Sequence, residues 1–557
     1  MKKLLSLLLT LLAMLCGTIS AANYDFHVGG VYYSIIPSTT NLTVVSGDAK
    51  YIGDIVIPSG ITVNDVDYIV TRIGQYSFAE CPGLTSITFP SDINGKLTVI
   101  EPNAFQNCKS ITSLIIPNTV TLIDAYAFTG CSSLKSVTIG SGVKKIGNVA
   151  FSGCTSLERV DISDLSAWYD IDFIEYANAN MAASNPLYYA KHLYLNGEEV
   201  TELNVPDELT QIKPRAFYNC EGLISVYISN SAKITSIGEK AFCGCKNITS
   251  VKLNKELKEI NIGAFLGCQE IESIIIPDEV TLIADGAFGD CSKLKDLTLG
   301  NALEEIRGSV MYGGAFGGTA VTEITVPEKI HNLHGFWRSN VNTINIDKTA
   351  LIDISSGNVD TYIPITRINI TNLATFMNIK KQLDGYDLYL NGELVEDLTI
   401  PSPIDDIKEN AMQGCKSLKS LTIPSHVKSF GKSAFQGCNS LKKVYTRIQN
   451  PSEFDDNVFS VDAYQHSTLV VPVGAIEKYK ATAGWKNFLD IVAEGSEQNE
   501  KEGDLTGDGE VNGSDLVQLI EYVLMGKSDV KAADLNGDGE VNGTDVVKLV
   551  NMILGKE

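Results

Sequence analysis

Two acidic loops near the end of the chain have the residue types and spacing of calcium ligands. "DLTGDGEVNGSD" begins at Asp504, and "DLNGDGEVNGTD" begins thirty residues later at Asp534. Loop positions 1, 3, 5, 9 and 12 carry side-chain oxygens, position 7 offers its backbone carbonyl, and glycine at position 6 permits a sharp turn. Hard oxygen donors at this spacing suit Ca²⁺, which takes about six to eight oxygens. The predicted ligands of two calcium ions are Asp504, Thr506, Asp508, Glu510, Asn512 and Asp515 in the first loop, and Asp534, Asn536, Asp538, Glu540, Asn542 and Asp545 in the second.

The elements around these loops differ from those of an ordinary EF-hand, which has a helix before each loop and a glutamate at position 12. Here a polar acidic linker, residues 494–503, precedes the first loop, and position 12 is aspartate. Each loop leads into one apolar segment, "LVQLIEYVLMG" or "VVKLVNMILG", that predicts a helix. Residues 504–557 hold eleven acidic residues and four lysines, a net charge of −7. Bound cations would offset this repulsion and could stabilise a domain this small.

The doubled loop-plus-helix resembles a type I dockerin over about residues 504–557. This resemblance implies a small all-α, calcium-binding domain that binds a cohesin domain on another chain. Hydroxyls at loop position 11 fit the family, whereas glycine at position 10 and the apolar Ile520 and Val550 leave the class of cohesin open. The near-identity of the two halves would allow binding in two orientations related by a half-turn. The family's recognition pair falls on Gly513 and Ser514 in the first half and on Gly543 and Thr544 in the second.

The body of the chain repeats an Ala-Phe-x-x-Cys phrase, most often at a spacing of 23 residues. Cys108, Cys131 and Cys154 show this spacing, and later copies repeat it. Between two phrases, apolar residues such as Val137 and Ile139 alternate with polar ones, which predicts a short strand with one buried face. A repeat of 20–29 residues is typical of a leucine-rich solenoid, in which each unit buries its apolar face against its neighbours.

Stacking of the repeats predicts two columns of identical side chains. The aromatic column comprises Phe78, Phe105, Phe128, Phe151, Phe217, Phe242, Phe265, Phe288, Phe316 and Phe435, with Met412 in one position. The second column contains the cysteines three residues later, and Thr319 replaces one of them. A position that accepts threonine favours small buried thiols over disulfides, although neighbouring coils lie close enough for either. Cys243 lies outside this column and is predicted to be an exposed thiol.

The segments that interrupt or flank the repeats divide the chain into parts. Insertions near 163–205 and 345–400 both end in "LYLNGE", which predicts a hairpin around Asn-Gly. We expect Trp168 to pack the first insertion against the solenoid. Residues 23–75 alternate like paired strands and predict a β-rich N-terminal cap. The solenoid extends over 76–493 and closes with a helix near Trp485, because its ends need covering.

The "AFxxCxxLxxVxIP" unit resembles the BspA-like leucine-rich repeat family over most of residues 76–493, and "GAIEKYKATAGWKNFLDIV" resembles that family's usual ending. The resemblance implies an α/β repeat solenoid of mostly short parallel strands. It also implies a secreted or cell-surface protein that binds other proteins, since some relatives are adhesins for host matrix proteins. No set of ligand-contacting residues carries over from the family.

The first 22 residues have the pattern of a secretory signal peptide, with two lysines, an apolar run and small residues at Ala21 and Ala22. Cys16 raises the alternative of lipid attachment, but residues 13–15 match that motif poorly. No later segment is apolar enough to predict a transmembrane span. The net charge of −23 argues against a nucleic-acid partner, which would require clustered lysine and arginine. We therefore expect a secreted, extracellular or cell-surface-associated protein.

No catalytic residues are predicted, because the repeats occupy nearly the whole chain and the metalloprotease, serine-hydrolase and phosphate-loop motifs are absent. The prediction is a non-catalytic adhesion protein, whose solenoid binds a protein and whose dockerin docks onto a cohesin-bearing scaffold. The alternative is a glycan-binding component of a polysaccharide-degrading system. Outward-facing strand positions line the concave side of the solenoid. The aromatic contact candidates on or near it are Tyr227, Trp337 and Tyr445.

Overall fold

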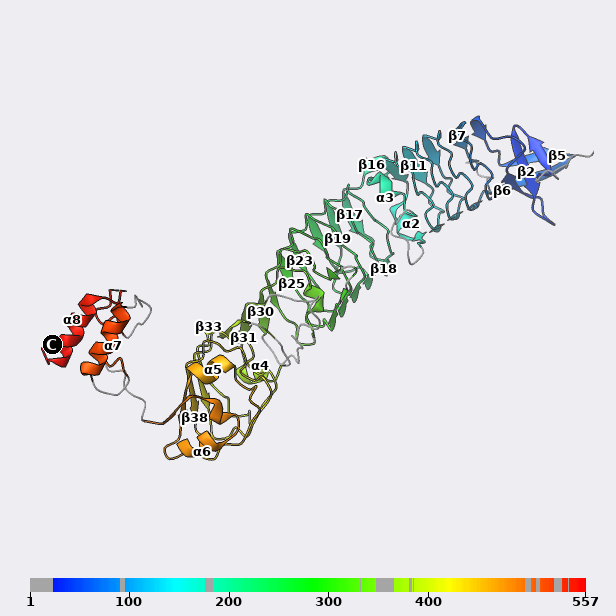
Figure 1. Cartoon of the computed structure of the whole chain (residues 1–557). Helices are drawn as coiled ribbons and strands as arrows, with labels where there is room; N and C mark the ends of the chain where they lie inside the picture. The colour runs from blue at the N-terminus through cyan, green and yellow to red at the C-terminus, as the bar shows by residue number, and fades with distance from the viewer. Residues whose placement is uncertain are drawn as a thin grey trace, which may run out of the picture. The chain divides into compact units, whose positions relative to one another are not determined.

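The computed structural model describes residues 24–90, 96–175, 184–309, 311, 313–330, 332–346, 365–379, 383, 385–495, 502–506, 511–524, 533–538 and 540–556. The predicted signal peptide lies outside these residues. The chain divides into two compact units, residues 1–393 and 394–557. Figure 1 shows a ladder of short strands along the first unit.

A group of longer strands, mostly antiparallel, begins the first unit. Strand β3(Asn41–Val45) pairs in parallel with β6(Val66–Ile73), and β6 pairs in the same way with the first short strand of the repeats, β8(Val99–Ile100). The buried Tyr33, Leu42 and Val44 form its core. The strands that precede the repeats are therefore continuous with the repeat sheet. They are β1(Phe26–Val28), β2(Val31–Ile35), β3(Asn41–Val45), β5(Gly60–Val63) and β6(Val66–Ile73).

Each repeat in the first unit contributes one strand to a face that we call the long-strand face. Its strands mostly have three to five residues, with apolar side chains buried and the intervening side chains directed outward, as the alternation predicts. Within each run of strands, neighbours pair in parallel and in register, so Ile115, Thr138 and Asp161 lie side by side. The strands are β4(Gly53–Val56), β7(Leu84–Thr88), β9(Ser113–Ile115), β11(Ser136–Ile139), β13(Arg159–Ile162), β15(Leu193–Leu195), β17(Glu202–Val205), β19(Ser225–Ile228), β21(Ser250–Lys252), β23(Ser273–Ile275), β25(Asp296–Thr298), β29(Glu323–Thr325), β30(Thr343–Ile346), β31(Arg367–Ile370) and β32(Asp387–Leu390).

A second series of two-residue strands closes each coil on another side. These strands also pair in parallel, and each contributes one buried apolar residue, such as Ile123 or Ile260. Because every coil repeats the same positions, this core runs the length of the repeats. After β8 the strands are β10(Leu122–Ile123), β12(Lys145–Ile146), β14(Asp172–Phe173), β18(Gln211–Ile212), β20(Ser236–Ile237), β22(Glu259–Ile260), β24(Leu282–Ile283) and β26(Glu305–Ile306).

The predicted aromatic column is present. From Phe78 to Phe151 and from Phe217 to Phe316, consecutive rings lie 4.9–5.4 Å apart with interplanar angles of 1–20°. This distance follows the spacing of paired strands. The column continues to Phe336, 5.1 Å from Phe316, in the 3₁₀-helix η1(His334–Phe336). The repeat pattern does not predict this ring, because no cysteine phrase accompanies it.

The predicted cysteine column consists of buried thiols that bind the preceding coil. The Sγ atoms of Cys108, Cys245 and Cys268 donate to phenylalanine carbonyls of the coil before, at 3.0–3.2 Å. Burial raises the pKa of Cys291 to about 12, so its thiol stays protonated and can donate. Thr319 is equally buried, and its hydroxyl donates to a carbonyl of its own coil. These contacts explain why the column requires a small donor.

The prediction that Cys243 is exposed is wrong. Its side chain is only 7 % exposed. Burial raises the pKa of the Cys243 thiol to about 11, although the neighbouring Tyr218 hydroxyl and nearby cations oppose this shift. Its position one residue past the phenylalanine places the thiol beneath Tyr218, and sequence spacing alone did not show this.

The first insertion forms an additional coil of the solenoid. The helix α2(Leu165–Tyr169), capped by Asp164, replaces the turn between the long strand β13 and the two-residue strand β14. Trp168 is buried and its Nε1 donates to the carbonyl oxygen of Ala216 at 2.9 Å, so the predicted packing of this side chain is confirmed. The short helix α3(Leu187–Ala190) precedes β15. The second insertion resembles the first, with α4(Leu373–Met377), capped by Asn372, in the place of α2.

Both "LYLNGE" segments form the predicted hairpins. β15 pairs antiparallel with β16(Glu198–Glu199), and β32 lies beside β33(Glu393–Leu394). Asn196 and Gly197 have φ of 52° and 94°, and the second turn has nearly the same values. Two positive φ angles in succession define the turn that Asn-Gly favours. A further small hairpin joins β27(Gly308–Ser309) and β28(Gly313–Gly314).

The second unit contains the last repeats and two helices near the end of the chain. Phe435 and Phe459 stack at 5.2 Å, and Trp485, fully buried, packs against Phe430, Phe454 and Tyr479. This aromatic cluster covers the final coils. The elements are β34(Asp397–Thr399), β35(Asp406–Ile407), β36(Ser420–Ile423), β37(Ser429–Phe430), β38(Lys443–Thr446), α5(Val461–His466), β39(Thr468–Val471), α6(Ile476–Ala481), η3(Trp485–Asn487), β40(Asp490–Ala493), α7(Gly513–Leu524) and α8(Gly543–Ile553).

Removal of one ring from the aromatic column should destabilise the solenoid strongly. We expect Phe265→Ala to lower the free energy of unfolding by about 3–5 kcal/mol, because it leaves a cavity between two stacked rings. Denaturant unfolding of the full chain measures this change, with the outward-facing Thr298→Ala as the control. A loss below about 1 kcal/mol would contradict the importance of the column.

Candidate functional site

The two loops near the end of the chain are positioned by a small apolar core of their own. Leu519 of α7 and Leu549 of α8 are fully buried and lie in one cluster with Ala533 and Leu535. Leu519 and Leu549 occupy the same place in the two halves, thirty residues apart. The core therefore holds α7 and α8 together and places each loop at the beginning of its helix.

The second loop orients its oxygen donors through its own backbone. Asp534 accepts hydrogen bonds from the amides of Gly537 and Asp538, at 2.8 and 3.2 Å. Asn536, Asp538 and Asn542 each accept an amide hydrogen bond from the residue two positions later, at 2.9 Å. These bonds restrain the side chains of positions 1, 3, 5 and 9 before any ligand binds. Glu540, at position 7, is exposed, and its carbonyl is the predicted donor.

The aspartates at position 12 are the buried members of the two loops. One oxygen of Asp515 accepts from the amides of Leu505 and Thr506, both at 2.8 Å, and the other accepts from the amide of Asn512 at 2.8 Å. Asp545 makes equivalent bonds at 2.8–3.1 Å. Burial raises the pKa of Asp515, but these amide bonds and the Thr506 hydroxyl outweigh it, so the net shift is downward. Each aspartate thus joins the two ends of its loop.

The oxygen donors present fit a hard cation such as Ca²⁺. In the second loop, all the predicted ligand residues are described and supply carboxylates, amide oxygens and one backbone carbonyl. Over the described residues, no three His, Cys, Asp or Glu side chains are grouped as a metal site. The carboxylate of Asp545 is instead directed at backbone amides. In the first loop, Asp508 and Glu510 lie outside the described residues, so their arrangement stays a prediction.

The predicted recognition residues lie on the surface at the start of the two helices. Gly513 and Ser514 begin α7, Gly543 and Thr544 begin α8, and all four are exposed. Equivalent apolar side chains follow on each helix. They are Val517 and Val547, at 59 % and 60 % exposed, and Leu524 and Leu554, at 80 % and 58 %. The two helices therefore present similar partly apolar surfaces.

Comparison with family models gives two matches. The BspA type leucine-rich repeat region matches in six copies over residues 60–179, 188–314 and 385–480. The dockerin type I domain matches residues 502–554. The chain belongs to the BspA-type leucine-rich repeat family and ends in a type I dockerin domain. Both are non-catalytic binding or assembly modules, and the comparison shows no enzymatic domain.

Solved structures similar to the chain are bacterial leucine-rich repeat proteins. One from Bacteroides ovatus is 21 % identical, covering 76 % of this chain and 94 % of its own, with a TM-score of 0.37. A leucine-rich cell surface protein from Faecalibacterium prausnitzii is 20 % identical, with the same coverages and a TM-score of 0.29. The comparison with curated proteins gave no match. No helix in the described part of the chain is both long and apolar enough to cross a membrane.

The long-strand face of the BspA-type repeats is the second candidate site. Tyr227 is 42 % exposed there, with Lys252 Nζ 4.8 Å from its ring centroid. Tyr445, in the second unit, is half-buried beside Thr422. Trp337 is only 7 % exposed, and Arg338 covers its ring at 4.8 Å, so the prediction of an exposed contact there is wrong. The turn after η1 carries this side chain into the solenoid.

Two pockets open on this face where the sheet is interrupted. The long-strand ladder ends at β21 and resumes at β23, and it ends again at β25 and resumes at β29. The first gap holds a pocket of about 490 Å³, lined by Val251, Leu253, Ile274 and Ile275 among others. Val251 is half-buried, whereas Val226 of the preceding coil is 1 % exposed. The interruption therefore makes a core position accessible.

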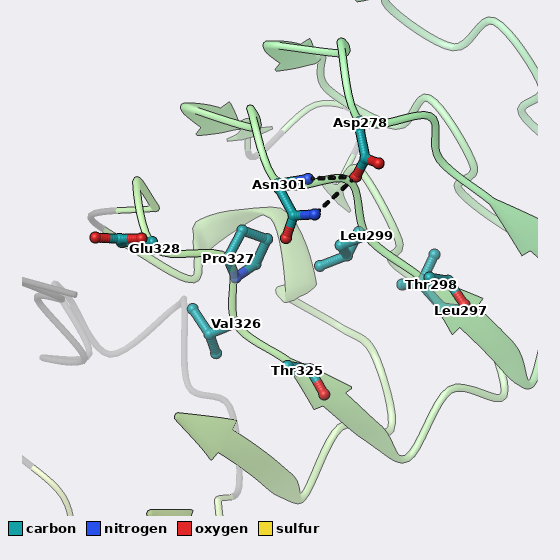
Figure 2. Close-up of a pocket in the computed structure, with 9 residues that line it drawn as sticks. All are labelled: Asp278, Leu297, Thr298, Leu299, Asn301, Thr325, Val326, Pro327 and Glu328. Carbon is teal, nitrogen blue, oxygen red and sulfur yellow. Dashed lines mark hydrogen bonds between the residues drawn. The ribbon is translucent and has the colours of Figure 1, made fainter. Parts of the chain in front are cut away.

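The second pocket, of about 470 Å³, is more polar. Figure 2 shows Asn301 donating through its backbone and side-chain nitrogens to one oxygen of Asp278, at 3.1 and 2.9 Å. Thr298 and Thr325 lie along the neighbouring strands. The apolar and polar pockets thus adjoin on one face, and Asp278 lines both.

Loss of the buried Asp515 carboxylate should destabilise the dockerin in a pH-dependent manner. We expect Asp515→Asn to lower the free energy of unfolding by about 1–3 kcal/mol at pH 7, since it leaves buried amides without acceptors. A lowered pKa in the folded state means that this contribution is present above the ordinary value of 3.8 and is lost as pH falls below it.

Circular dichroism of residues 502–556, which contain their own core, measures this stability during denaturation between pH 7 and pH 2. The difference between wild type and variant should shrink below pH 3.8, with the exposed Glu521→Gln as control. A difference that is independent of pH would contradict the assigned role of the charge.

Proposed function

We propose that this protein is an extracellular, non-catalytic adhesion protein with two binding parts. Its dockerin, loaded with two calcium ions, docks onto a cohesin domain of a scaffold, and its repeats bind a protein partner. The observation that carries this proposal is the doubled loop and helix, which matches the dockerin family over residues 502–554. The predicted signal peptide supports export from the cell.

Calcium would act in the dockerin by holding the oxygens of each loop together. In the second loop, Asp534, Asn536, Asp538, Asn542 and Asp545 would hold the ion, together with the Glu540 carbonyl. The ion would offset the repulsion between the carboxylates, so its binding free energy would stabilise the packing of α7 against α8. The exposed Val517 and Val547, near the recognition residues, would then contact the cohesin.

The pocket between β21 and β23 supports a protein partner for the repeats. Ile275 is 70 % exposed beside this pocket, and Tyr227 is exposed two strands before it. Exposed aromatic and aliphatic side chains next to a pocket are typical of the anchors that dominate protein interfaces. Lys252 adds a positive charge that would favour an acidic residue of the partner.

A second candidate function is glycan binding, in which the dockerin would bring the repeats beside polysaccharide-degrading enzymes. The polar pocket between β25 and β29 favours it, because threonine, asparagine and carboxylate groups line that pocket. Such groups bind hydroxyls through directional hydrogen bonds.

Docking should require calcium and should tolerate the loss of either dockerin helix surface. We expect the full chain to bind at least one of a panel of purified type I cohesins in calcium and to be released by a chelator. Val517→Arg or Val547→Arg alone should weaken binding by only about twofold, since one of two equivalent orientations remains. The double variant should lose binding. Surface plasmon resonance distinguishes these outcomes, and complete loss from one single variant would contradict two orientations.

A charged side chain at the apolar pocket should abolish binding of a protein partner. We expect Ile275→Asp to weaken binding to a purified extracellular matrix protein at least tenfold, because it places a charge among apolar contacts. Ile115→Asp is the matched control, since Ile115 is 69 % exposed on the same face but lines neither pocket. Solid-phase binding to a panel of matrix proteins measures the effect. Equal loss in both variants would show that the pocket is not the contact.

A further inference from the structure

Two matching clusters of arginine, an Asx residue and tyrosine lie on the long-strand face. Arg159 and Asp161 of β13 lie beside Tyr194 of β15, and Arg367 and Asn369 of β31 lie beside Tyr389 of β32. Each tyrosine belongs to a "LYLNGE" hairpin. The clusters are therefore copies of one arrangement within the chain, and they differ at the Asx position.

In the first cluster one edge of the guanidinium, formed by Nε and Nη2, is engaged by a carboxylate of its own strand. The Arg159 Cζ lies 3.8 Å above the Tyr194 ring. Its Nε donates to both oxygens of Asp161 at 2.9 and 2.7 Å, and Nη2 donates at 2.6 Å. The hydrogen bond to Asp161 holds the pKa of Arg159 above its ordinary value. This cluster is a closed ion pair.

In the second cluster the same stack leaves donors unused. The Arg367 Cζ lies 3.8 Å above the Tyr389 ring, and Nε donates to Asn369 Oδ1 at 3.0 Å. Among the described residues, the two Nη atoms have neither a hydrogen bond nor an ion pair. Stacking and the Nε bond hold the plane of the guanidinium, so its outer edge is presented to solvent in a fixed orientation.

A directional row of amides continues from this arginine across the sheet. Asn369 donates to Asn345 of β30 at 2.6 Å, and Asn345 donates to Glu323 of β29 at 2.8 Å. Asn345 also lies 3.5 Å from Thr325, which lines the polar pocket of Figure 2. The row and the pocket thus form one polar surface from β25 to β32. The equivalent row in the first copy has Ile115 and Thr138 instead.

The charged side chains around this surface indicate which class of ligand it can bind. Asp387 lies opposite Arg367 in the parallel register, and Glu323, Glu328 and Asp278 lie along the row or pocket. These carboxylates would repel an anionic ligand, and the arginine would oppose a basic one. Tyr389 is covered by the Arg367 guanidinium, so its ring is not available as an apolar anchor for a peptide. The amide and guanidinium groups of this surface are planar donors and acceptors, and they are spaced as neighbouring strands are. A ligand that carries many neutral hydroxyls can bind such groups through hydrogen bonds.

We propose that the surface formed by Arg367, Asn369, Asn345 and the adjoining polar pocket binds a neutral oligosaccharide. The Nη donors of Arg367 and the carboxylate of Asp387 would bind neighbouring hydroxyls of one sugar, and the amides and threonines would bind the next. This site rests on the second candidate function. Its polar pocket adjoins the apolar pocket, since Asp278 lines both, but Ile275 lines only the apolar one.

The two copies supply a matched pair of variants. Asn369→Asp introduces the residue of the closed cluster, which should engage the Arg367 fork and weaken glycan binding at least tenfold. Asp161→Asn, the reverse change in the first copy, should leave binding unchanged or strengthen it. Arg367→Lys, which keeps the charge but loses the planar fork, should also weaken binding at least tenfold. The full chain and the three variants are tested on an array of neutral and uronic-acid oligosaccharides, followed by calorimetry with the strongest binder.

Binding of the full chain to a neutral oligosaccharide, lost in Asn369→Asp and kept in Asp161→Asn, would establish the site. Binding to no neutral oligosaccharide, or only to uronic-acid ones, would overturn the proposal. Neutral binding that Asn369→Asp retains would overturn its location. Matrix-protein and cohesin binding by the Asn369→Asp variant should remain at the wild-type level. Failure of the glycan site is therefore distinguishable from failure of the other proposed interactions.

Discussion

Registration of one coil on the next is the constraint on which the rest of this structure depends. Each coil places a phenylalanine over a phenylalanine at about the spacing of paired strands, and most place a thiol under the preceding coil's carbonyl. Because a coil contacts mainly its neighbours, these positions cannot vary independently. Where the helix α2 replaces the turn between two strands of a coil, Trp168 reaches the carbonyl of Ala216 and maintains the connection between coils.

The same constraint leaves the outward strand positions free to vary, and the candidate binding features lie there. The buried residues of β13 and β31 are equivalent, yet one strand carries Arg159 and Asp161 and the other Arg367 and Asn369. Asn369 has an amide nitrogen where Asp161 has a second carboxylate oxygen. The ion pair is therefore replaced by a single hydrogen bond, and the Nη atoms of Arg367 are left as donors. Interruptions of the long-strand ladder are a second source of variation between coils, because they open pockets on this face while the phenylalanine rings stay stacked.

The dockerin is organised differently, because hydrogen bonds within each loop hold the side chains of that loop. Hydrogen bonds over two to four residues orient Asp534, Asn536 and Asp538, and the aspartate at position 12 joins both ends of the loop. A buried carboxylate is stable there because several amides donate to it. The apolar core then needs only a few leucines from each half, which explains how so short a sequence can be repeated and packed against itself.

The sequence alone determined the features that depend on period or on short-range pattern. The strands, the aromatic and thiol columns, the Asn-Gly hairpins and the two helices after the acidic loops all follow from residues within one repeat or one loop. Contacts that depart from the repeat were decided only by the tertiary structure. Cys243 is buried beneath Tyr218, Trp337 is turned inward beside Arg338, and Phe336 extends the column without its usual phrase. The stacking of Arg367 on Tyr389 likewise joins residues of separate strands, and no periodicity encodes it, because side-chain orientation at such positions depends on the neighbouring coil.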